Sequence, residues 1–420
     1  MDKFVIQGGR PLSGTISVSG AKNATLALMP AAILAPGISF LRNTPALRDV
    51  TTMTSLLRTM GMGIDFRDNL LTLDSTVIDG YEAPYEHVKK MRASIYVLGP
   101  LIARYGRAKV SLPGGRAWGP RPVNLHIEGI RKLGAEIEME GGYIIAKAGR
   151  LHGARIHFDV SSVGATGNVM MAASLAEGTT LIENAAMEPE ITALAGFLIA
   201  MGARIDGVGT NRLEIQGADE LHPADVITIP DRIEAGTFLI AGAITGGNVT
   251  LEHVVPEHLS AIIAKLEDAG CTIRSGPGSL SLTAPPAIRP VDVTAAIYPG
   301  FPTDMQAQWT SLMSIASGRA VVTDSIYFDR FKHVPELTRL GADIELKENA
   351  AVIRGVTRLT GAKVMSTDLR ASASLILAGL VASGTTEVLR VYHIDRGYEA
   401  IEKKLQSLGA DIRREAGEEF

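Results

Sequence analysis

One pattern recurs six times along the chain, and this repetition restricts the fold more than any other feature of the sequence. A glycine that follows an apolar stretch and precedes an expected strand returns about every 70 residues, at Gly37, Gly106, Gly178, Gly247, Gly318 and Gly384. A second marker, reading approximately Leu-Gly-Ala-x-Ile, keeps the same spacing at Gly61, Gly134, Gly202, Gly270, Gly341 and Gly409. Such a period is too long for a simple solenoid and fits a small α/β unit used six times. We therefore expect an α/β fold with six comparable units.

The composition excludes several classes of protein. The chain has 420 residues, of which 46% are apolar and 44 are glycine, so it can bury a sizeable core and turn often. A net charge of −4, with 5% aromatic residues and no basic stripe, argues against nucleic-acid partners. The single cysteine, Cys271, excludes internal disulfides and cysteine metal sites, and we expect it to be a small core residue. The 9 histidines show no metal-ligand spacing, so no metal is expected.

The apolar stretches of the chain are too short to cross a membrane. They run for about 12–15 residues and are rich in Ala and Gly, which is typical of buried helices. The first residues, MDKFVIQGGRPLSG, include an early acid and lack the apolar run of a signal peptide. We expect a cytoplasmic protein without a membrane partner.

Each repeat contains one helix of small apolar residues, expected to end at its marker glycine as a C-terminal cap. These helices begin near Lys22, Arg92, Gly164, Arg232, Asp304 and Asp368. A helix that is apolar almost all round is buried on most sides. A second, more amphipathic helix in each unit, such as LHIEGIRKLGA, is expected outside it.

Charged and polar residues gather at the starts of these apolar helices: Lys22, Asn23, Arg92, Arg232, Glu234, Asp304, Asp368 and Arg370. Asp at a helix start is explained by capping, but Lys or Arg there opposes the helix dipole. Because helix N-termini bind anions, the basic residues favour an anionic ligand held in a cationic pocket that also contains carboxylates. The alternative is a set of structural ion pairs, for example between Asp368 and Arg370.

Two similar passages predict where the chain crosses between domains. SVSGAKNA (17–24) and TIPDRIEAG (228–236) each lead from a strand into an apolar helix. We expect one three-unit domain of residues 22–229 and a second made of residues 1–21 and 230–420. The ligand pocket is expected between them, where such sites are common.

One long connection, LPGGRAWGPRPVNLH (112–126), breaks the regularity, because its glycines and prolines prevent regular structure. It is either a passive connector or, since it carries Arg116, Trp118, Arg121 and His126, a mobile lid over an anionic substrate. SSVGAT (161–166) is a weaker candidate for an anion-binding loop.

At these positions the chain resembles the enolpyruvyl transferases that act on UDP-N-acetylglucosamine. The motifs that carry the resemblance are SGAKNA, MRAS, LPGG, SVGAT, PDRIE, FPTDMQAQ, TDLRASAS and YHIDRGYE, in order along the whole chain. The resemblance implies an inside-out α/β barrel in each of two domains, three βαβαββ units per domain. It implies phosphoenolpyruvate and a UDP-sugar as substrates, with no cofactor, and the first committed step of peptidoglycan synthesis as the activity.

The resemblance also implies residue roles. Lys22 and Asn23 match contacts to phosphoenolpyruvate and the sugar, and Arg92, Arg121 and Arg396 match arginines that grip phosphoenolpyruvate. Asp304 matches the proposed base for the acceptor 3′-hydroxyl, and Asp368 matches a carboxylate near the reacting carbon. The remaining matches are nucleotide-sugar contacts: Arg121, Pro122, Val123, Asn124 and Leu125 at the uridine, Ser162, Val163 and Gly164 at the diphosphate, and Ile326.

These residue types suit enolpyruvyl transfer. The reaction protonates the methylene of phosphoenolpyruvate, adds a hydroxyl to the resulting cationic carbon and eliminates phosphate. Cations must stabilise the anionic substrate and the leaving phosphate. A base for the hydroxyl and an acid for the methylene are also required.

The chain departs from the family pattern at the loop. Arg116 occupies the place of the usual proton-donating cysteine, and arginine is a very poor acid because its pKa is above about 12. Trp118, Pro120, Asn124 and Val160 also differ from the usual residues. Two classes of function therefore stay open: a transferase acting on UDP-N-acetylglucosamine or a related nucleotide, and a catalytically silent homologue that binds a nucleotide sugar. The missing thiol predicts resistance to fosfomycin, and the oligomeric state is left open.

Overall fold

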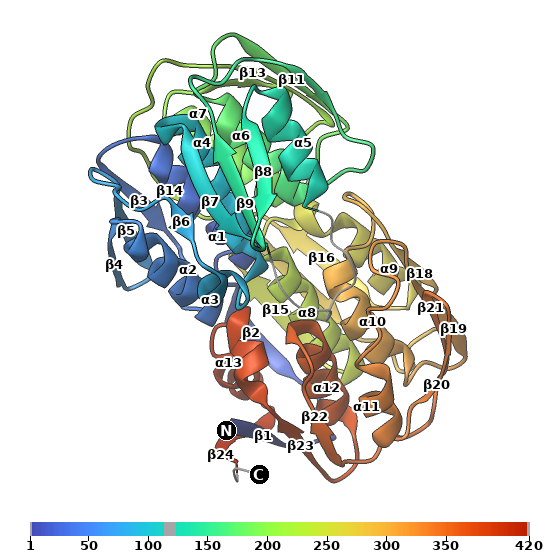
Figure 1. The fold of residues 1–420 in the computed structure, drawn as a ribbon. Helices are drawn as coiled ribbons and strands as arrows, with labels where there is room; N and C mark the ends of the chain where they lie inside the picture. Colours follow the sequence, from blue (N-terminus) through green and yellow to red (C-terminus); the bar gives the residue numbers. More distant parts are fainter. Residues whose placement is uncertain (1, 113–122, 418–420) are drawn as a thin grey trace. The chain divides into compact units, whose positions relative to one another are not determined.

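The computed structural model describes residues 2–112 and 123–417 and divides into two compact units (Figure 1). Unit 1 comprises Met1–Ser19 and Pro230–Phe420, and unit 2 comprises Gly20–Ile229. The division differs from the predicted one in assigning Gly20 and Ala21 to unit 2. The reason is local: the Ala21 N–H donates to the Ile229 carbonyl at 2.7 Å, and the Gly20 backbone packs directly against the Asn43 carbonyl.

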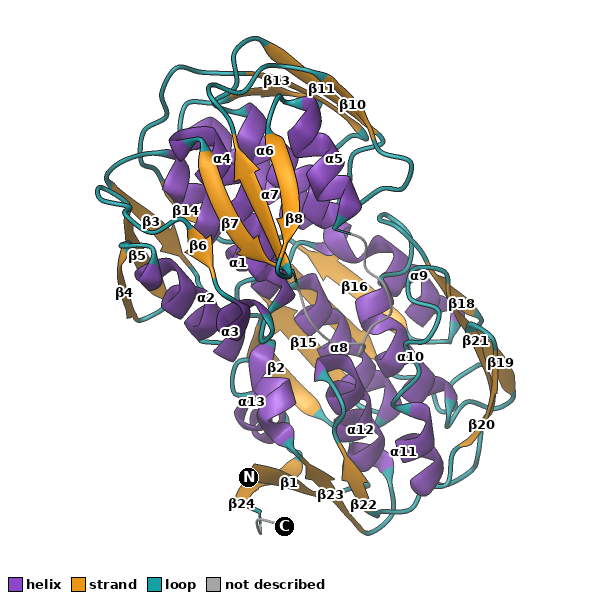
Figure 2. Ribbon diagram, viewed as in Figure 1, coloured by secondary structure: helices purple, strands orange, loops and turns teal. Residues whose placement is uncertain are grey.

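The described residues form six four-stranded sheets that share one topology, which confirms the predicted sixfold α/β architecture. In every sheet an edge strand runs parallel to its neighbour, and the other two strands follow antiparallel. Strands alternate apolar and polar residues, as in Arg212–Gln216, so one face of each sheet is buried. The apolar helices, one from each repeat, lie inside each unit, and the sheets lie outside them (Figure 2).

The sheets of unit 2 have the orders β14-β3-β5-β4, β6-β7-β9-β8 and β10-β11-β13-β12. Their strands are β3 (Ile38–Arg42), β4 (Gly63–Arg67), β5 (Leu70–Asp74), β6 (Glu82–Ala83), β7 (Arg107–Ser111), β8 (Glu136–Glu140), β9 (Tyr143–Lys147), β10 (Arg155–His157), β11 (Thr179–Glu183), β12 (Arg204–Asp206), β13 (Arg212–Gln216) and β14 (Asp225–Ile227).

The sheets of unit 1 have the orders β16-β17-β15-β2, β18-β19-β21-β20 and β22-β23-β1-β24. Their strands are β1 (Asp2–Gln7), β2 (Ser13–Ser17), β15 (Asn248–Glu252), β16 (Thr272–Gly276), β17 (Ser279–Thr283), β18 (Val293–Ala295), β19 (Arg319–Asp324), β20 (Asp343–Lys347), β21 (Ala350–Arg354), β22 (Lys363–Met365), β23 (Thr385–Leu389) and β24 (Asp411–Ala416).

Three strands complete sheets far from their place in the sequence. β2 and β14 immediately precede the first helices of the two halves, yet β2 pairs with β15 and β14 pairs with β3. β1 inserts between β23 and β24, so the two ends of the chain lie close together in unit 1 (Figure 1). The long-range exchange of strands closes both units.

The apolar helices begin where the sequence predicted and form the interior of each unit. They are α1 (Lys22–Ala31) continued by η1 (Ala32–Leu34), η2 (Arg92–Val97) continued by α4 (Leu98–Tyr105), α6 (Val163–Ala173), α8 (Arg232–Ile244), η5 (Thr303–Met305) continued by α10 (Gln306–Met313), and α12 (Leu369–Val381). In unit 1, α8, α10 and α12 pack against one another. Cys271 lies buried in this unit's core, as expected, and burial raises the pKa of its thiol to about 11.

The second helices are α2 (Arg48–Thr59), α5 (Asn124–Lys132), α7 (Pro189–Ala200), α9 (Ser260–Asp268), α11 (Val334–Arg339) and α13 (Ile401–Ser407), with short α3 (Tyr85–Val88), η4 (Pro256–Leu259) and η6 (Val391–Arg396) between elements. Each second helix ends at the second marker, which reads Leu-Gly-Ala in three of the six copies and whose glycine has φ between +93° and +105°. The residue after the glycine donates its N–H five residues back, as Ala135 does to Ile130. This Schellman geometry requires the left-handed conformation that glycine adopts without strain.

The other marker glycine was predicted to cap the apolar helices, and this prediction is wrong in most units. Gly106 caps α4 with φ +67°. Elsewhere the helix ends earlier, as α8 does at Ile244 and α12 at Val381, and the glycine opens the following strand. The sequence spacing could not separate these places because both lie within a few residues of the helix end.

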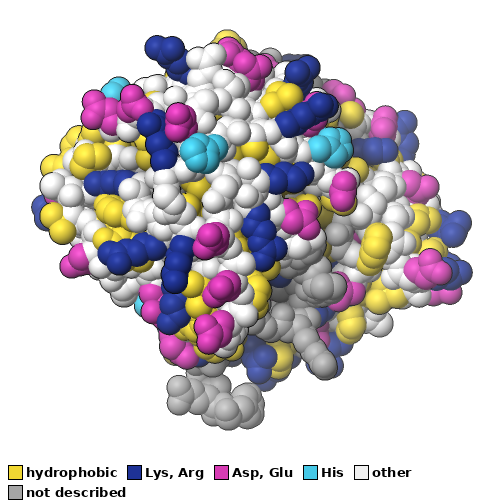
Figure 3. Space-filling model, turned by 45° about the horizontal axis from the view of Figure 1, so that its top comes forward, with side chains coloured by type: hydrophobic (Ala, Val, Ile, Leu, Met, Phe, Trp, Pro, Cys, Tyr) yellow, Lys and Arg dark blue, Asp and Glu magenta, His cyan; other side chains and the backbone are white. Residues whose placement is uncertain are grey.

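On the face in Figure 3, acidic and basic side chains are interspersed. Within the described ranges, no helix combines the length and the apolar character needed to span a membrane.

Candidate functional site

The predicted site residues divide between the two units. Lys22, Asn23, Arg92, Val123, Asn124, Leu125, Ser162, Val163 and Gly164 belong to unit 2, and Asp304, Ile326, Asp368 and Arg396 belong to unit 1. The predictions for Arg116, Arg121 and Pro122 fall on 113–122, outside the described residues.

In unit 2, a buried carboxylate holds the predicted lysine. Lys22 is the first residue of α1, and its Nζ lies 2.9 Å from Oδ2 of Asp49, in the first turn of α2. The Asp49 side chain is 3% exposed and that of Lys22 is 12% exposed. Asn23 beside it is exposed. The ion pair keeps an ammonium group at the dipole-opposed end of α1.

The predicted uridine stretch begins a helix. Val123 is the N-cap of α5, and Asn124, Leu125 and His126 lie in its first turn. The expectation that the irregular loop extends to residue 126 is therefore wrong. His126 is buried, and burial lowers its pKa to about 4, so it is neutral at pH 7.

The predicted diphosphate loop has the geometry of a capped helix start. Ser162 is the N-cap of α6, and its Oγ accepts from the Ala165 N–H at 3.2 Å. Ser162, Val163 and Gly164 are half-buried. This start offers backbone N–H groups and a hydroxyl proton, the groups that bind anions at helix N-termini.

In unit 1, Asp304 is gripped by two arginines. Its Oδ1 lies 2.8 Å from Nη1 of Arg330, and its Oδ2 accepts from Nη2 of Arg370 at 2.9 Å. Burial alone would raise the pKa of Asp304, but the charges and hydrogen bonds of Arg370 and Arg330 hold it well below its usual value. Asp304 is ionised in this arrangement.

A buried polar network surrounds this ion pair. Arg370 Nη1 donates to the Tyr398 hydroxyl at 3.2 Å, and that hydroxyl lies 2.8 Å from Thr237 Oγ1. Gln308 donates to the Asp304 carbonyl at 2.9 Å. The network joins α8, α10, α12 and Tyr398, which lies two residues after η6, so the position of Asp304 depends on all of them.

Ile326 lies in a turn fixed to the same cluster. The N–H groups of Ile326 and Tyr327 donate to Asp324 Oδ1 at 2.9 and 2.8 Å, and Thr303 donates to Asp324 Oδ2 at 2.6 Å. Arg330 follows in the same connection after β19. The structure thus brings Asp304 and Ile326 to one end of β19.

Asp368 acts as a helix cap. Its Oδ1 accepts from the N–H groups of Arg370 and Ala371 at 2.9 and 3.0 Å at the start of α12. The alternative of an ion pair between Asp368 and Arg370 is wrong, because the Arg370 guanidinium turns to Asp304. Arg396 is half-buried at the end of η6.

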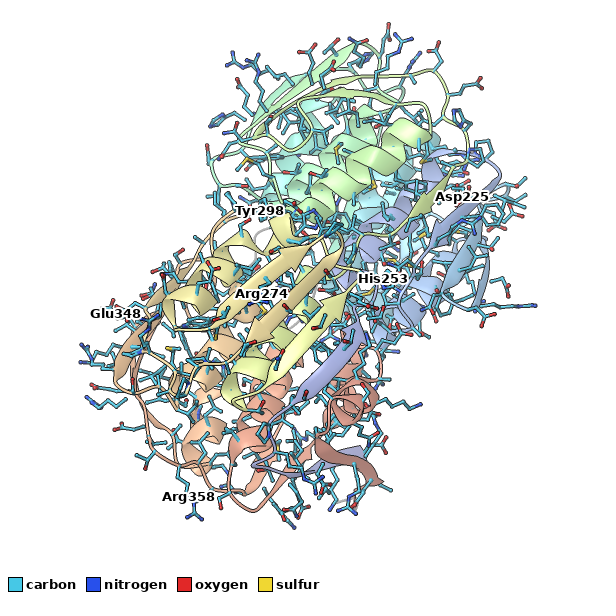
Figure 4. The ribbon with its side chains drawn as sticks, turned by 180° about the vertical axis from the view of Figure 1, so that it is seen from behind. Asp225, His253, Arg274, Tyr298, Glu348 and Arg358 are labelled. Carbon is cyan, nitrogen blue, oxygen red and sulfur yellow. The ribbon has the colours of Figure 1, made fainter. Side chains whose placement is uncertain are left out.

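Two other predicted charges at a helix start have structural partners. Arg232 lies with its guanidinium 5.5 Å from the ring centre of Tyr298, the tyrosine that Figure 4 labels. Glu234 accepts from the Ser19 N–H at 2.9 Å and from Lys404. Burial raises the pKa of Glu234 although Lys404 opposes the rise. For these two residues the structure favours ion-pair and packing roles.

Sequence reasoning missed Asp49, Arg330, Tyr398 and Asn168. Asp49, Arg330 and Asn168 each act through a partner distant in the chain, so the local sequence pattern carried no signal for them. Tyr398 alone had one, since it lies in the quoted motif YHIDRGYE. Among residues 2–112 and 123–417, no three His, Cys, Asp or Glu side chains gather as a metal site would require.

Comparison with known proteins identifies the family. The family model for EPSP synthase (3-phosphoshikimate 1-carboxyvinyltransferase) matches residues 6–405. The chain belongs to this enolpyruvyl transferase family. The match covers both units, so the six-unit architecture is that of the family.

Similar proteins extend over the full length. UDP-N-acetylglucosamine 1-carboxyvinyltransferase of Chloroherpeton thalassium is 60% identical, over 100% of this chain and 99% of the relative. The protein of that name from Chlorobium limicola is 58% identical over 100% of both chains. The crystal structure of the enolpyruvyl transferase NikO from Streptomyces tendae matches with a TM-score of 0.88 and 26% identity, over 98% of each chain. EPSP synthase from Acinetobacter baumannii, at 20% identity and a TM-score of 0.75 over 99% of this chain and 100% of that one, shares the fold.

Proposed function

We propose that this protein transfers the enolpyruvyl group of phosphoenolpyruvate to the 3′-hydroxyl of UDP-N-acetylglucosamine and releases phosphate. The observation that carries the proposal is the full-length similarity, at 60% identity, to a relative named UDP-N-acetylglucosamine 1-carboxyvinyltransferase. The reaction would be the first committed step of peptidoglycan synthesis, in the cytoplasm, without cofactor.

The cationic side chains suit the anionic substrate. Positive charge for a phosphate and a carboxylate comes from five side chains: Lys22 and Arg92 in unit 2, and Arg330, Arg370 and Arg396 in unit 1. A cation that is held in place, as Lys22 is by Asp49, stabilises the charge that develops on a leaving phosphate without reorganising during the reaction. Asn23, Val123–Leu125, Ser162–Gly164 and Ile326 are the proposed contacts of the nucleotide sugar.

Asp304 is the proposed base, and its two arginines determine when it can act. A carboxylate whose pKa lies far below 7 removes a proton poorly. An anionic substrate that draws Arg330 or Arg370 away from Asp304 would remove the charges that lower the pKa of Asp304 and leave the effect of burial, which raises it. We propose that binding of phosphoenolpyruvate thereby activates the base, while Asp368 lies near the reacting carbon.

We propose that no thiol donates the proton that the methylene of phosphoenolpyruvate takes up. Arg116 stands at the loop position, and an arginine guanidinium is a very poor acid at neutral pH. We propose that another group donates this proton and that the protein resists fosfomycin. A catalytically silent homologue that binds the nucleotide sugar is the second candidate, favoured by Arg116 alone.

The test is phosphate release from phosphoenolpyruvate with UDP-N-acetylglucosamine, with the product examined by mass. Phosphate release together with a product heavier by one enolpyruvyl group is expected. Nucleotide-sugar binding without release would favour the second candidate. Fosfomycin is then added in excess, and rapid inactivation with a stoichiometric adduct would contradict the predicted resistance.

A further inference from the structure

Resting on the proposed function, we propose that Asn168 is a positioning residue that fixes three ligand-contacting segments of unit 2 relative to one another. The segments are η2 with Arg92, the start of α5 with Val123–Leu125, and the start of α6 with Ser162–Gly164. No ligand contact is assigned to Asn168 itself, because the side chain is fully buried.

The Asn168 side chain uses its polar atoms to join three elements. Its Oδ1 accepts from the Gly99 N–H at 2.8 Å, and its Nδ2 donates to the Ile95 carbonyl at 2.9 Å. Its Nδ2 also lies 2.9 Å from Nδ1 of His126. Asn168 belongs to α6, and His126 belongs to α5. Ile95 and Gly99 belong to η2 and to α4, which continues it, so one amide connects three helical segments.

The backbone partners determine the orientation of this amide. A flipped amide would place Oδ1 against the Ile95 carbonyl and Nδ2 against the Gly99 N–H, and both contacts would be repulsive. With Nδ2 as donor, Nδ1 of His126 must accept, so the His126 proton lies on Nε2. The neutral state of buried His126 agrees with this tautomer.

Two glycines allow the three elements to approach closely. A Cβ on Gly99 would lie 2.4 Å from the Asn168 carbonyl oxygen, and a Cβ on Gly164 would lie 2.9 Å from Cε1 of His126. The His126 ring therefore packs directly beneath the proposed diphosphate contact. Because a buried amide left without partners costs free energy, the three segments hold one arrangement.

The test compares Asn168→Leu with Ser174→Ala. Ser174 is a matched control, since it lies just after the same helix, is fully buried and donates within the helix to Met170 at 2.9 Å. Hydrogen–deuterium exchange is measured for peptides covering 92–97, 123–127 and 162–166. Asn168→Leu is expected to speed exchange in all three segments at least tenfold, and Ser174→Ala in none.

Ligand affinity separates positioning from a merely structural role. Titration calorimetry with UDP-N-acetylglucosamine is expected to show a Kd at least tenfold weaker for Asn168→Leu and within twofold of wild type for Ser174→Ala. In turnover, KM for the nucleotide sugar should rise about tenfold while kcat falls less than threefold. Faster exchange with unchanged affinity would overturn the proposal, as would unchanged exchange in 92–97 and 123–127.

A second variant covers failure of the first to fold. His126→Phe removes the α5 arm of the network and leaves the bonds of Asn168 to Ile95 and Gly99. Exchange should then rise in 123–127 and stay unchanged in 92–97, and equal effects on both segments would contradict the arrangement. If wild-type protein does not bind UDP-N-acetylglucosamine, the proposed function fails, and the exchange data still decide whether Asn168 joins the segments.

Discussion

At the residue scale, each of two proposed catalytic side chains forms an ion pair with a residue that has no assigned role in the reaction itself. Lys22 has Asp49, and Asp304 has Arg330 and Arg370. Lys22 is fixed before the substrate arrives and needs no reorganisation, whereas the arginines of Asp304 hold its pKa low until an anion draws one of them away. Substitution of the ion-pair partner therefore tests the proposed role as well as substitution of the catalytic residue does.

Asp49→Asn is expected to lower kcat/KM for phosphoenolpyruvate by up to about 100-fold, because Lys22 loses the carboxylate that positions it. The free energy of unfolding should fall by about 1–3 kcal/mol, since the Lys22 ammonium loses its charged acceptor in a largely buried place. Steady-state kinetics and urea denaturation measure both effects. Asp225→Asn is the control: it breaks an ion pair with Arg42 that is exposed, 2.6 Å long and in the same unit, and should change neither quantity appreciably. Full activity in Asp49→Asn would exclude the positioning role.

Asp304→Ala is expected to abolish transfer while nucleotide-sugar binding is largely retained. Removing this carboxylate also leaves Arg370, whose side chain is 4% exposed, without its charge partner, so stability should fall by about 3–5 kcal/mol. Asp304→Asn keeps a hydrogen-bond acceptor and should be less destabilised but equally inactive. Comparing the two variants separates the loss of the base from the loss of stability. Measurable turnover in Asp304→Asn would show that Asp304 is not the base.

At the element scale, helix ends explain which predictions succeeded. The six apolar helices start where charge and composition change together, so their starts could be read from the sequence. Their ends could not, because several small residues near each marker glycine are equally suitable. His126 shows the same limit: Pro and Gly before it predicted a loop, whereas its burial against Gly164 and Asn168 places it in α5.

Ion-pair and strand partners that are distant in the sequence could not be predicted from it, for a physical reason. The ion pair of Lys22 with Asp49 and that of Asp304 with Arg370 depend on how helices pack, and local propensity is silent about packing. The exchange of β2 and β14 between sheets is of the same kind. Periodicity predicts that six units exist, and only tertiary structure decides which strand completes which unit.

The Schellman glycines give a prediction with a control in the same helix. Gly202 follows α7 with φ +105°, so Gly202→Ala should destabilise the protein by about 1–2 kcal/mol. Gly196 lies inside α7, and a Cβ there would meet no atom within 4 Å, so Gly196→Ala should stabilise by up to about 1 kcal/mol. Chemical denaturation measures both. Equal effects of the two substitutions would contradict the conformational argument.

At the scale of the whole molecule, each unit has its own hydrophobic core. One core is built from residues between Leu26 and Leu221, and the other from residues of 4–18 and 233–412. Separate cores allow separate unfolding transitions. Each unit also contains one buried histidine, His126 in unit 2 and His333 in unit 1, and burial lowers the pKa of each to about 4.

These histidines predict how stability depends on pH. Between about pH 6.5 and pH 4 the unfolded chain binds a proton at each histidine that the folded unit does not, so stability is fully present above pH 6.5 and falls as the pH is lowered to 4. At pH 5 each histidine is expected to have cost its unit about 2 kcal/mol relative to pH 7. Urea denaturation at the two pH values, followed by hydrogen exchange of each unit, measures the loss of stability.

His126→Phe should flatten the pH dependence of the stability of unit 2 alone, and His333→Phe should flatten the pH dependence of the stability of unit 1 alone. A single transition that both substitutions affect equally would show instead that the two cores unfold together.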